Sequence, residues 1–146
     1  MRFNLSFLPS IITNFIEKGP IMKNALDYLT WEHVELGVRI TGCDNRFEGA
    51  MVIPDHINGV AVVEIGEKAF ANCGTLVSVV IPDSVEVVGE KAFSYCSELE
   101  ELHLGAGIKK IEKQAFTGCS SLRRVVLPST LEARGRVRVR VRARNK

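Results

Sequence analysis

Four cysteines are the side chains of this sequence with the greatest capacity for metal or redox chemistry. Cys73, Cys96 and Cys119 follow one another at equal intervals, and Cys43 precedes them at a longer interval. Zinc sites usually draw their ligands from close pairs such as C-x-x-C, and the sequence contains no such pair. We therefore predict that Cys73, Cys96 and Cys119 are small buried apolar side chains, and we expect no metal site and no cofactor.

Nucleophilic catalysis by a hydroxyl group next to a histidine is the other chemistry to consider. His103 is the only histidine between residues 62 and 130, with Ser78 as the possible nucleophile and Glu101 as the possible orienting carboxylate. A triad also needs donors for an oxyanion, and no motif of the sequence supplies them. Walker and H-E-x-x-H motifs do not occur either. We predict that the protein is not an enzyme and has no catalytic residue.

Basic residues are concentrated at the C-terminus. The formal net charge of the 146-residue chain is +2, but residues 132–146 contribute +6, which leaves −4 for the rest. A free tail with Arg136, Arg138, Arg140 and Arg142 in alternation would bind nucleic acid or an anionic membrane, and this is our alternative functional hypothesis. A solvated tail, an edge strand and a gene end read out of frame are further interpretations of the same residues.

An internal repeat accounts for most of the remaining sequence. Its three units have the same length and comprise residues 62–84, 85–107 and 108–130. Apolar residues recur in register, at Ile65/Val88/Ile111, Ala69/Ala92/Ala115, Phe70/Phe93/Phe116, Cys73/Cys96/Cys119 and Leu76/Leu99/Leu122. A unit of this length cannot bury so much apolar surface alone, so the pattern predicts a solenoid in which stacked units share one core.

Each unit contains the signals of two extended segments. Its L-x-x-L-x-L motif alternates at the end, as in Leu76-x-x-Val79-x-Ile81, which predicts a half-buried strand that ends at a proline such as Pro82. A second short extended segment follows at Val85-x-x-Val88 and its equivalents. We expect the A-F-x-x-C stretch to form one helical turn, which gives an α/β repeat solenoid with a parallel strand layer.

These columns, V-x-x-I-G-x-x-A-F-x-x-C-x-x-L-x-x-V-x-I-P, resemble the BspA-type leucine-rich repeat, also called the type-5 or Treponema-type repeat. The resemblance covers residues 37–131 and includes the start of the array, where Ile53-Pro54 is followed by the turn Ile57-Asn58-Gly59. It implies a right-handed leucine-rich-repeat array and a non-enzymatic role in protein–protein interaction. Proteins with this repeat are often bacterial surface adhesins, so it also implies a secreted or cell-surface location.

The outer side of the strand layer is the expected binding surface of such a solenoid. Equivalent positions are neighbours on adjacent strands, so Glu100 would face Arg123 and Glu101 would face Arg124. Val80, His103 and Val126 form a further outward row. We predict that these three residues, with Glu101 and Arg124, contact a protein partner, although charge pairing and β-propensity alone would also explain them.

The two ends do not follow the repeat. Residues 1–36 predict a helical or hairpin cap, with one helix that includes Ile11, Ile12, Phe15 and Ile16 and a second from Met22 to about Tyr28. Residues 1–20 lack the features of a good signal peptide, and this favours a cytoplasmic location. Met22 is a possible alternative start of the protein. The repeat stops near residue 131, followed by the tail 132–146. An uncovered final repeat leaves the oligomeric state and the completeness of the array open.

Overall fold

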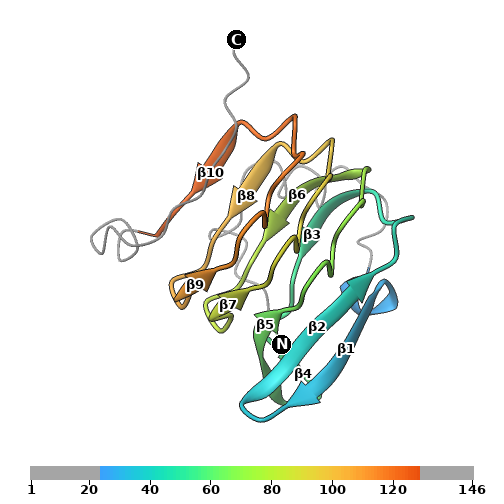
Figure 1. Cartoon of the computed structure of the whole chain (residues 1–146). Coiled ribbons are helices and arrows are strands. Elements are labelled where there is room, and N and C mark those ends of the chain that lie inside the picture. Colours follow the sequence, from blue (N-terminus) through green and yellow to red (C-terminus); the bar gives the residue numbers. More distant parts are fainter. Residues whose placement is uncertain (1–23, 129–146) are drawn as a thin grey trace.

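The computed structural model describes residues 24–128, which form two facing sheets wound from successive coils of the chain (Figure 1). The predicted helix around Ile11–Ile16 and the Arg-rich tail lie outside these residues. The described elements are the 3₁₀-helix η2 (Ala25–Asp27) and the strands β1 (Leu29–Val34), β2 (Gly37–Cys43), β3 (Gly49–Val52), β4 (His56–Ile57), β5 (Val60–Ile65), β6 (Leu76–Val80), β7 (Val87–Val88), β8 (Glu101–His103), β9 (Lys110–Ile111) and β10 (Arg124–Val126).

Parallel strands from equivalent parts of successive coils pair in both sheets, and β1 and β4 add antiparallel pairs to one of them. One sheet has the order β10-β8-β6-β3, and the other has the order β1-β2-β5-β7-β9, with β4 paired to β5. Residues that are equivalent in the repeat are direct partners across β6, β8 and β10, as in the row of Val79, Leu102 and Val125. The predicted parallel strand layer is therefore present, and its register aligns identical positions of neighbouring coils.

The core lies between the two sheets and the turns, and it consists of the recurring apolar columns. Phe70 and Phe93 are stacked with their ring centroids 4.8 Å apart, and Phe93 and Phe116 are stacked with centroids 5.4 Å apart. All three rings are buried, as are the three cysteines of the repeat. The prediction that these cysteines are buried small side chains is thus confirmed.

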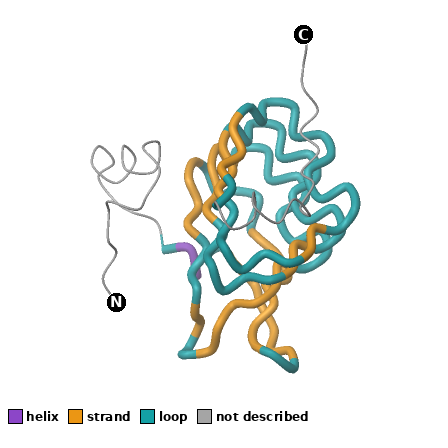
Figure 2. Tube along the Cα trace, turned by 90° about the vertical axis from the view of Figure 1, so that its left-hand side faces the viewer, coloured by secondary structure: helices purple, strands orange, loops and turns teal. Residues whose placement is uncertain are grey.

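The A-F-x-x-C stretch forms consecutive turns and not a helical turn, and residues 24–128 contain no α-helix (Figure 2). Alternate backbone N–H groups donate to the next coil: Lys68 to the carbonyl of Glu90, Phe70 to that of Ala92 and Asn72 to that of Ser94. A helix would use these donors within its own segment. The expected α/β class is corrected to a β-solenoid for this reason.

Left-handed backbone conformations allow the chain to make these turns. Lys68, Lys91 and Gln114, which occupy one column of the repeat, have φ values of +58°, +57° and +58°. Asn72 and Tyr95 are also in this region, with φ values of +65° and +59°. Side chains with a Cβ are disfavoured there, and the sequence shows no recurrent glycine at these positions that would have indicated the turns.

The cysteine column also satisfies backbone carbonyls between coils. The Cys96 thiol donates to the carbonyl of Phe70 over 3.1 Å, and the Cys119 thiol donates to the carbonyl of Phe93 over 3.0 Å. Ordinary leucine-rich repeats place an Asn or Cys in the loop after the strand for a comparable purpose. Here the buried thiols of the turn have this role, one coil after another.

The first coil begins with a β-hairpin. Strands β1 and β2 are antiparallel partners, and β2 then pairs in parallel with β5 of the repeat region. Of the second predicted helix, residues 24–28 are described, and only Ala25–Asp27 is helical, as a 3₁₀ turn. Leu29, the next residue, is buried and begins β1. Hydrogen bonding to β2 favours the strand over the helix.

We expect Phe93→Ala to lower the free energy of unfolding by about 3–5 kcal/mol, because the middle ring of the stack would be replaced by a cavity. Denaturant unfolding followed by circular dichroism measures this change. Leu36→Ala is the control, since Leu36 is 78% exposed, and it should cost less than about 0.5 kcal/mol. Similar losses for the two variants would contradict the assigned core.

We expect Lys68→Gly to raise the free energy of unfolding by about 1 kcal/mol, because glycine accepts the positive φ without steric conflict. The neighbouring Glu67, exposed like Lys68, has no positive φ, so Glu67→Gly should lower stability by about 0.5–1 kcal/mol. Thermal and denaturant unfolding of both variants provide the comparison. Destabilisation by both would show that the turn is not left-handed at residue 68.

Candidate functional site

The candidate site is the outer side of the sheet β10-β8-β6-β3, where the register places side chains in two rows. The outer row consists of Val80, His103 and Val126, which are direct partners on β6, β8 and β10. All three residues are half-buried. The structure therefore brings together the three residues that the sequence predicted to form one row.

The charged row consists of Ser78, Glu101 and Arg124 on the same three strands. Glu101 is its centre, because one carboxylate oxygen lies 3.1 Å from Nη1 of Arg124 and the other lies 3.1 Å from Nε2 of His103. Glu101 and His103 are two residues apart on β8, so both side chains project to the same side of the sheet. Glu101 thus connects the charged row to the outer row.

Glu101 is buried, although its position on the outer side of the strand layer predicted an exposed carboxylate. Glu101 is only 7% exposed, and Ser78, which lies between Ala50 and Glu101 in the register, is fully buried. Arg124 remains well exposed, with 64% of its side chain accessible. A buried carboxylate requires a charged partner to compensate for its lost hydration, and Arg124 provides it.

Ser78 and His103 do not form a nucleophile–base pair. The hydroxyl oxygen of Ser78 and Nε2 of His103 are both buried and without a hydrogen-bond partner within the part of the chain that the structure describes. The His103–Glu101 contact is short, but its orientation is not that of a hydrogen bond. A catalytic serine needs a hydrogen bond to its base, and Ser78 and His103 do not form one in this structure.

A second ion pair lies beside the charged row. Arg123 and Glu100 are 3.1 Å apart and more exposed than their neighbours, with 77% and 39% of their side chains accessible. Both pairings that the sequence predicted across β8 and β10, Glu100 with Arg123 and Glu101 with Arg124, are confirmed. What the sequence did not indicate is their difference in burial, since both pairs have the same residue types and the same spacing.

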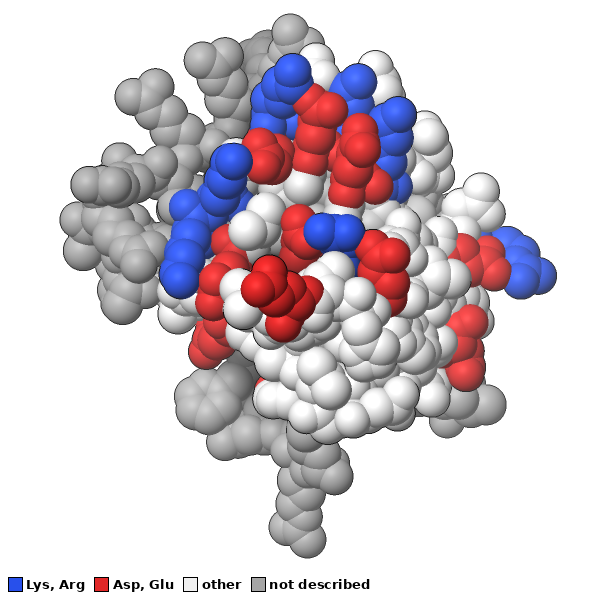
Figure 3. All heavy atoms as spheres, turned by 60° about the horizontal axis from the view of Figure 1, so that its bottom comes forward, with Lys and Arg blue, Asp and Glu red and all other residues white. Residues whose placement is uncertain are grey.

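Ion pairs between coils continue on other surfaces. Lys109 lies 3.3 Å from Glu86, and Lys113 lies 3.3 Å from Glu90, each pair linking equivalent segments of neighbouring coils. Figure 3 shows Lys and Arg beside Asp and Glu on one face of the molecule. Exposed pairs of this kind contribute at most about 1 kcal/mol each, so they support the stacking of coils without defining a site.

Neither a metal centre nor a membrane span is found in the described residues. Between residues 24 and 128, no three His, Cys, Asp or Glu side chains are grouped so that they could hold a metal ion. Over the same range, no helix has the length and apolar character needed to cross a bilayer. The predicted tail residues Arg136, Arg138, Arg140 and Arg142 lie outside this range.

Known structures share this architecture. A T. pallidum leucine rich repeat protein has a TM-score of 0.68 and 33% sequence identity, covering 73% of this chain and 50% of that one. A leucine-rich repeat protein from Bacteroides ovatus has a TM-score of 0.61 and 27% identity, covering 76% of this chain and 30% of that one. This chain thus spans half the length of the first structure and less than a third of the second. No match was found among curated proteins.

A solenoid of parallel strands with aligned repeat positions and a row of side chains on its strand layer defines a leucine-rich repeat protein. The sequence profile of the BspA type leucine rich repeat region matches residues 47–136 with six copies. The chain belongs to this family, whose fold commonly serves protein–protein interaction.

We expect the Glu101–Arg124 pair to contribute more to stability than the Glu100–Arg123 pair. Both pairs have the same N–O distance of 3.1 Å, but the Glu101 side chain is 9% exposed and the Glu100 side chain 39%. Double-mutant cycles with Ala should give less than about 1 kcal/mol of coupling for the exposed pair and a larger value for the buried carboxylate. Equal coupling energies would show that the burial of Glu101 has no energetic consequence.

Proposed function

We propose that the protein is a non-enzymatic interaction module that binds a protein partner through the outer side of its four-stranded sheet. The residues proposed to contact the partner are those of the outer row (Val80, His103 and Val126), together with Glu101 and Arg124. The observation that carries the proposal is the straight alignment of the outer row across three adjacent strands, next to the ion-pair network of Glu101.

The outer row supplies the apolar centre of the proposed interface. Val80 and Val126 lie on either side of His103 and retain solvent exposure although their side chains are apolar. Covering such a row with a partner removes apolar area from water, and each Å² contributes about 25 cal/mol. Protein interfaces typically combine an apolar centre of this kind with a polar rim.

Arg124 supplies the polar rim and the selectivity. One of its nitrogen atoms is held by the buried Glu101 carboxylate, while most of the side chain is exposed. An arginine fixed in this way has lost part of its conformational freedom before binding and presents further N–H donors to carbonyl or carboxylate groups of a partner. Glu101 then acts through Arg124 and His103, because its own side chain is nearly inaccessible.

We further propose a bacterial location outside the cell, of the adhesin type. Support for this location comes from the family to which the chain belongs, and the strand layer is the part of the solenoid that would meet the partner. A rigid sheet is suited to this role, because its binding residues are ordered before contact and lose little entropy on binding.

The test is affinity capture from candidate partner samples, with mass spectrometry of the bound proteins. The triple variant Val80→Lys/His103→Glu/Val126→Lys should lose the partner that the full-length chain retains. A matched control, Val87→Lys/Lys110→Glu, changes one row of the other sheet and should bind normally. Circular dichroism of each variant shows whether the fold is intact.

Reversal of both charges in Glu101→Arg/Arg124→Glu tests the proposed rim separately. The variant retains an ion pair across β8 and β10, but it moves the exposed cation away from its position at Arg124, so partner capture should weaken at least tenfold. Unchanged capture by this variant and by the triple variant would refute the strand face as the site. Loss on truncation after Leu131, with both face variants still active, would place binding in the tail instead.

A further inference from the structure

Cys73 differs from the other cysteines of its column in what its thiol contacts. The equivalent thiols of Cys96 and Cys119 donate to carbonyls of the preceding coil over 3.1 and 3.0 Å. The Cys73 thiol has only a long contact of 4.0 Å to the carbonyl of Cys43, at the end of β2. It is therefore held less firmly than its equivalents, and its neighbour in the preceding coil is itself a cysteine.

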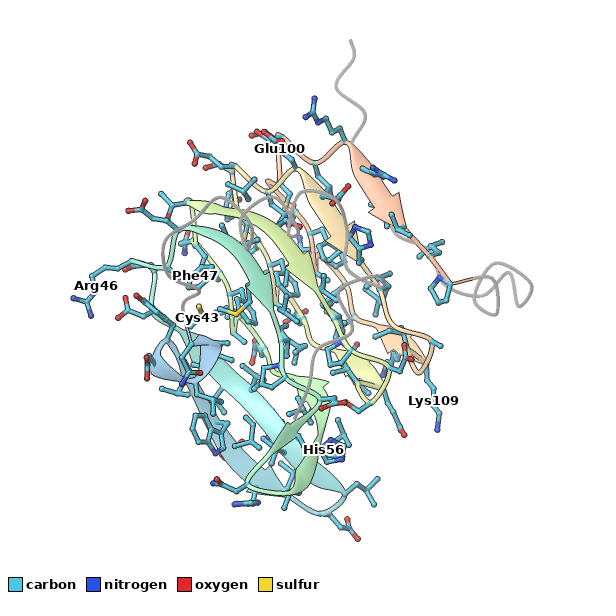
Figure 4. The ribbon with its side chains drawn as sticks, turned by 180° about the vertical axis from the view of Figure 1, so that it is seen from behind. Cys43, Arg46, Phe47, His56, Glu100 and Lys109 are labelled. Carbon is cyan, nitrogen blue, oxygen red and sulfur yellow. The ribbon has the colours of Figure 1, made fainter. Side chains whose placement is uncertain are left out.

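Cys43 and Cys73 are neighbours in the fold, because Sγ of Cys73 lies 4.0 Å from the carbonyl oxygen of Cys43. The interaction between the two side chains raises the pKa of Cys43 and lowers that of Cys73, and burial raises the pKa of both. Figure 4 shows the Cys43 side chain near Phe47, at the end of β2 where the hairpin meets the first turn. Neither cysteine is part of a disulfide in this structure.

Exposure separates this pair of thiols from the other one. The side chains of Cys96 and Cys119 also interact with each other, but both are buried. Cys43 is half-buried, whereas Cys73 is buried with its sulfur 4.0 Å from the carbonyl oxygen of Cys43. Cys43 is therefore the residue of the pair that is more open to a reagent in solution, and Cys73 is its neighbour. In the described part of the chain, the pair Cys43 and Cys73 thus has one half-buried member, whereas both members of the pair Cys96 and Cys119 are buried.

We propose that Cys43 and Cys73 are a modification site, at which a small-molecule disulfide such as oxidised glutathione converts the two thiols to an intramolecular disulfide. The Cys43 thiol loses its proton, and its sulfur attacks the small disulfide, forming a mixed disulfide and releasing one small thiolate. The Cys73 sulfur, after losing its proton, attacks the Cys43 sulfur and displaces the second small thiolate. Two electrons leave the cysteines, and the two small thiolates take up the two protons.

The disulfide would join the N-terminal hairpin to the first turn of the repeat. Cys43 ends β2, and Cys73 lies in the turn before β6, so the bond would close a loop that contains β3, β4 and β5. A crosslink that closes such a loop restricts the unfolded chain and stabilises the folded one.

The test exposes the full-length folded chain to a glutathione redox buffer, followed by acid quenching, alkylation and peptide mapping. We expect a Cys43–Cys73 linked peptide, while Cys96 and Cys119 are alkylated only after denaturation. The reaction should be slow at neutral pH and faster at higher pH, because the first step requires the Cys43 thiolate and the pKa of that thiol is raised. The oxidised chain should also melt at a higher temperature than the reduced chain.

Variants separate the two steps. Cys73→Ala should leave Cys43 as a persistent mixed disulfide with glutathione, whereas Cys43→Ser should prevent oxidation of Cys73. Cys119→Ala is the matched control and should still form the linked peptide. The proposal is overturned if the wild-type chain stops at the mixed disulfide, forms a crosslink between two chains or links other cysteines. An oxidised chain that melts no higher than the reduced one would overturn the proposed stabilisation.

Discussion

Register between successive coils, which brings equivalent residues into contact, underlies both the stability of this solenoid and the surface it presents. Backbone donors at Lys68, Phe70 and Asn72 bond to carbonyls of the following coil, and the rings of Phe70 and Phe93 stack in the same direction. Each coil therefore satisfies its hydrogen bonds and buries its apolar surface through its neighbours. A shift of one residue between coils would break both sets of contacts at once.

The candidate binding face is a consequence of the same alignment. Because β6, β8 and β10 pair in register, Val80, His103 and Val126 form a row without any contribution from distant loops. The neighbouring row places Glu101 next to Arg124, so that a nearly buried carboxylate holds an exposed guanidinium in position. Rigidity and recognition are thus linked, since the same strand pairing stabilises the solenoid and orders the side chains proposed to bind.

The first coil is where the repeat pattern and the structure diverge. Its β-hairpin, β1 with β2, replaces the neighbouring coil that an interior unit would have, and Cys43 lies where that hairpin meets the turn of the first repeat. Sγ of Cys73 lies 4.0 Å from the carbonyl oxygen of Cys43, and Cys43 is half-buried whereas the three cysteines of the repeat are buried. A crosslink at this position would join the hairpin to the first repeat.

Residue spacing alone was enough to predict the repeat, the strand register and the burial of the cysteine column, because a constant interval aligns identical chemistry in every coil. The same spacing predicted which glutamate faces which arginine, since side-chain partners in a parallel sheet follow directly from register. The folded chain was needed to show that the A-F-x-x-C stretch turns without a helix, because its N–H groups find acceptors in the next coil. Packing between coils likewise makes Glu101 more buried than Glu100, and it places Cys43 next to Cys73. The interval between these two cysteines differs from that of the repeat, so they become neighbours only when the hairpin folds onto the first turn.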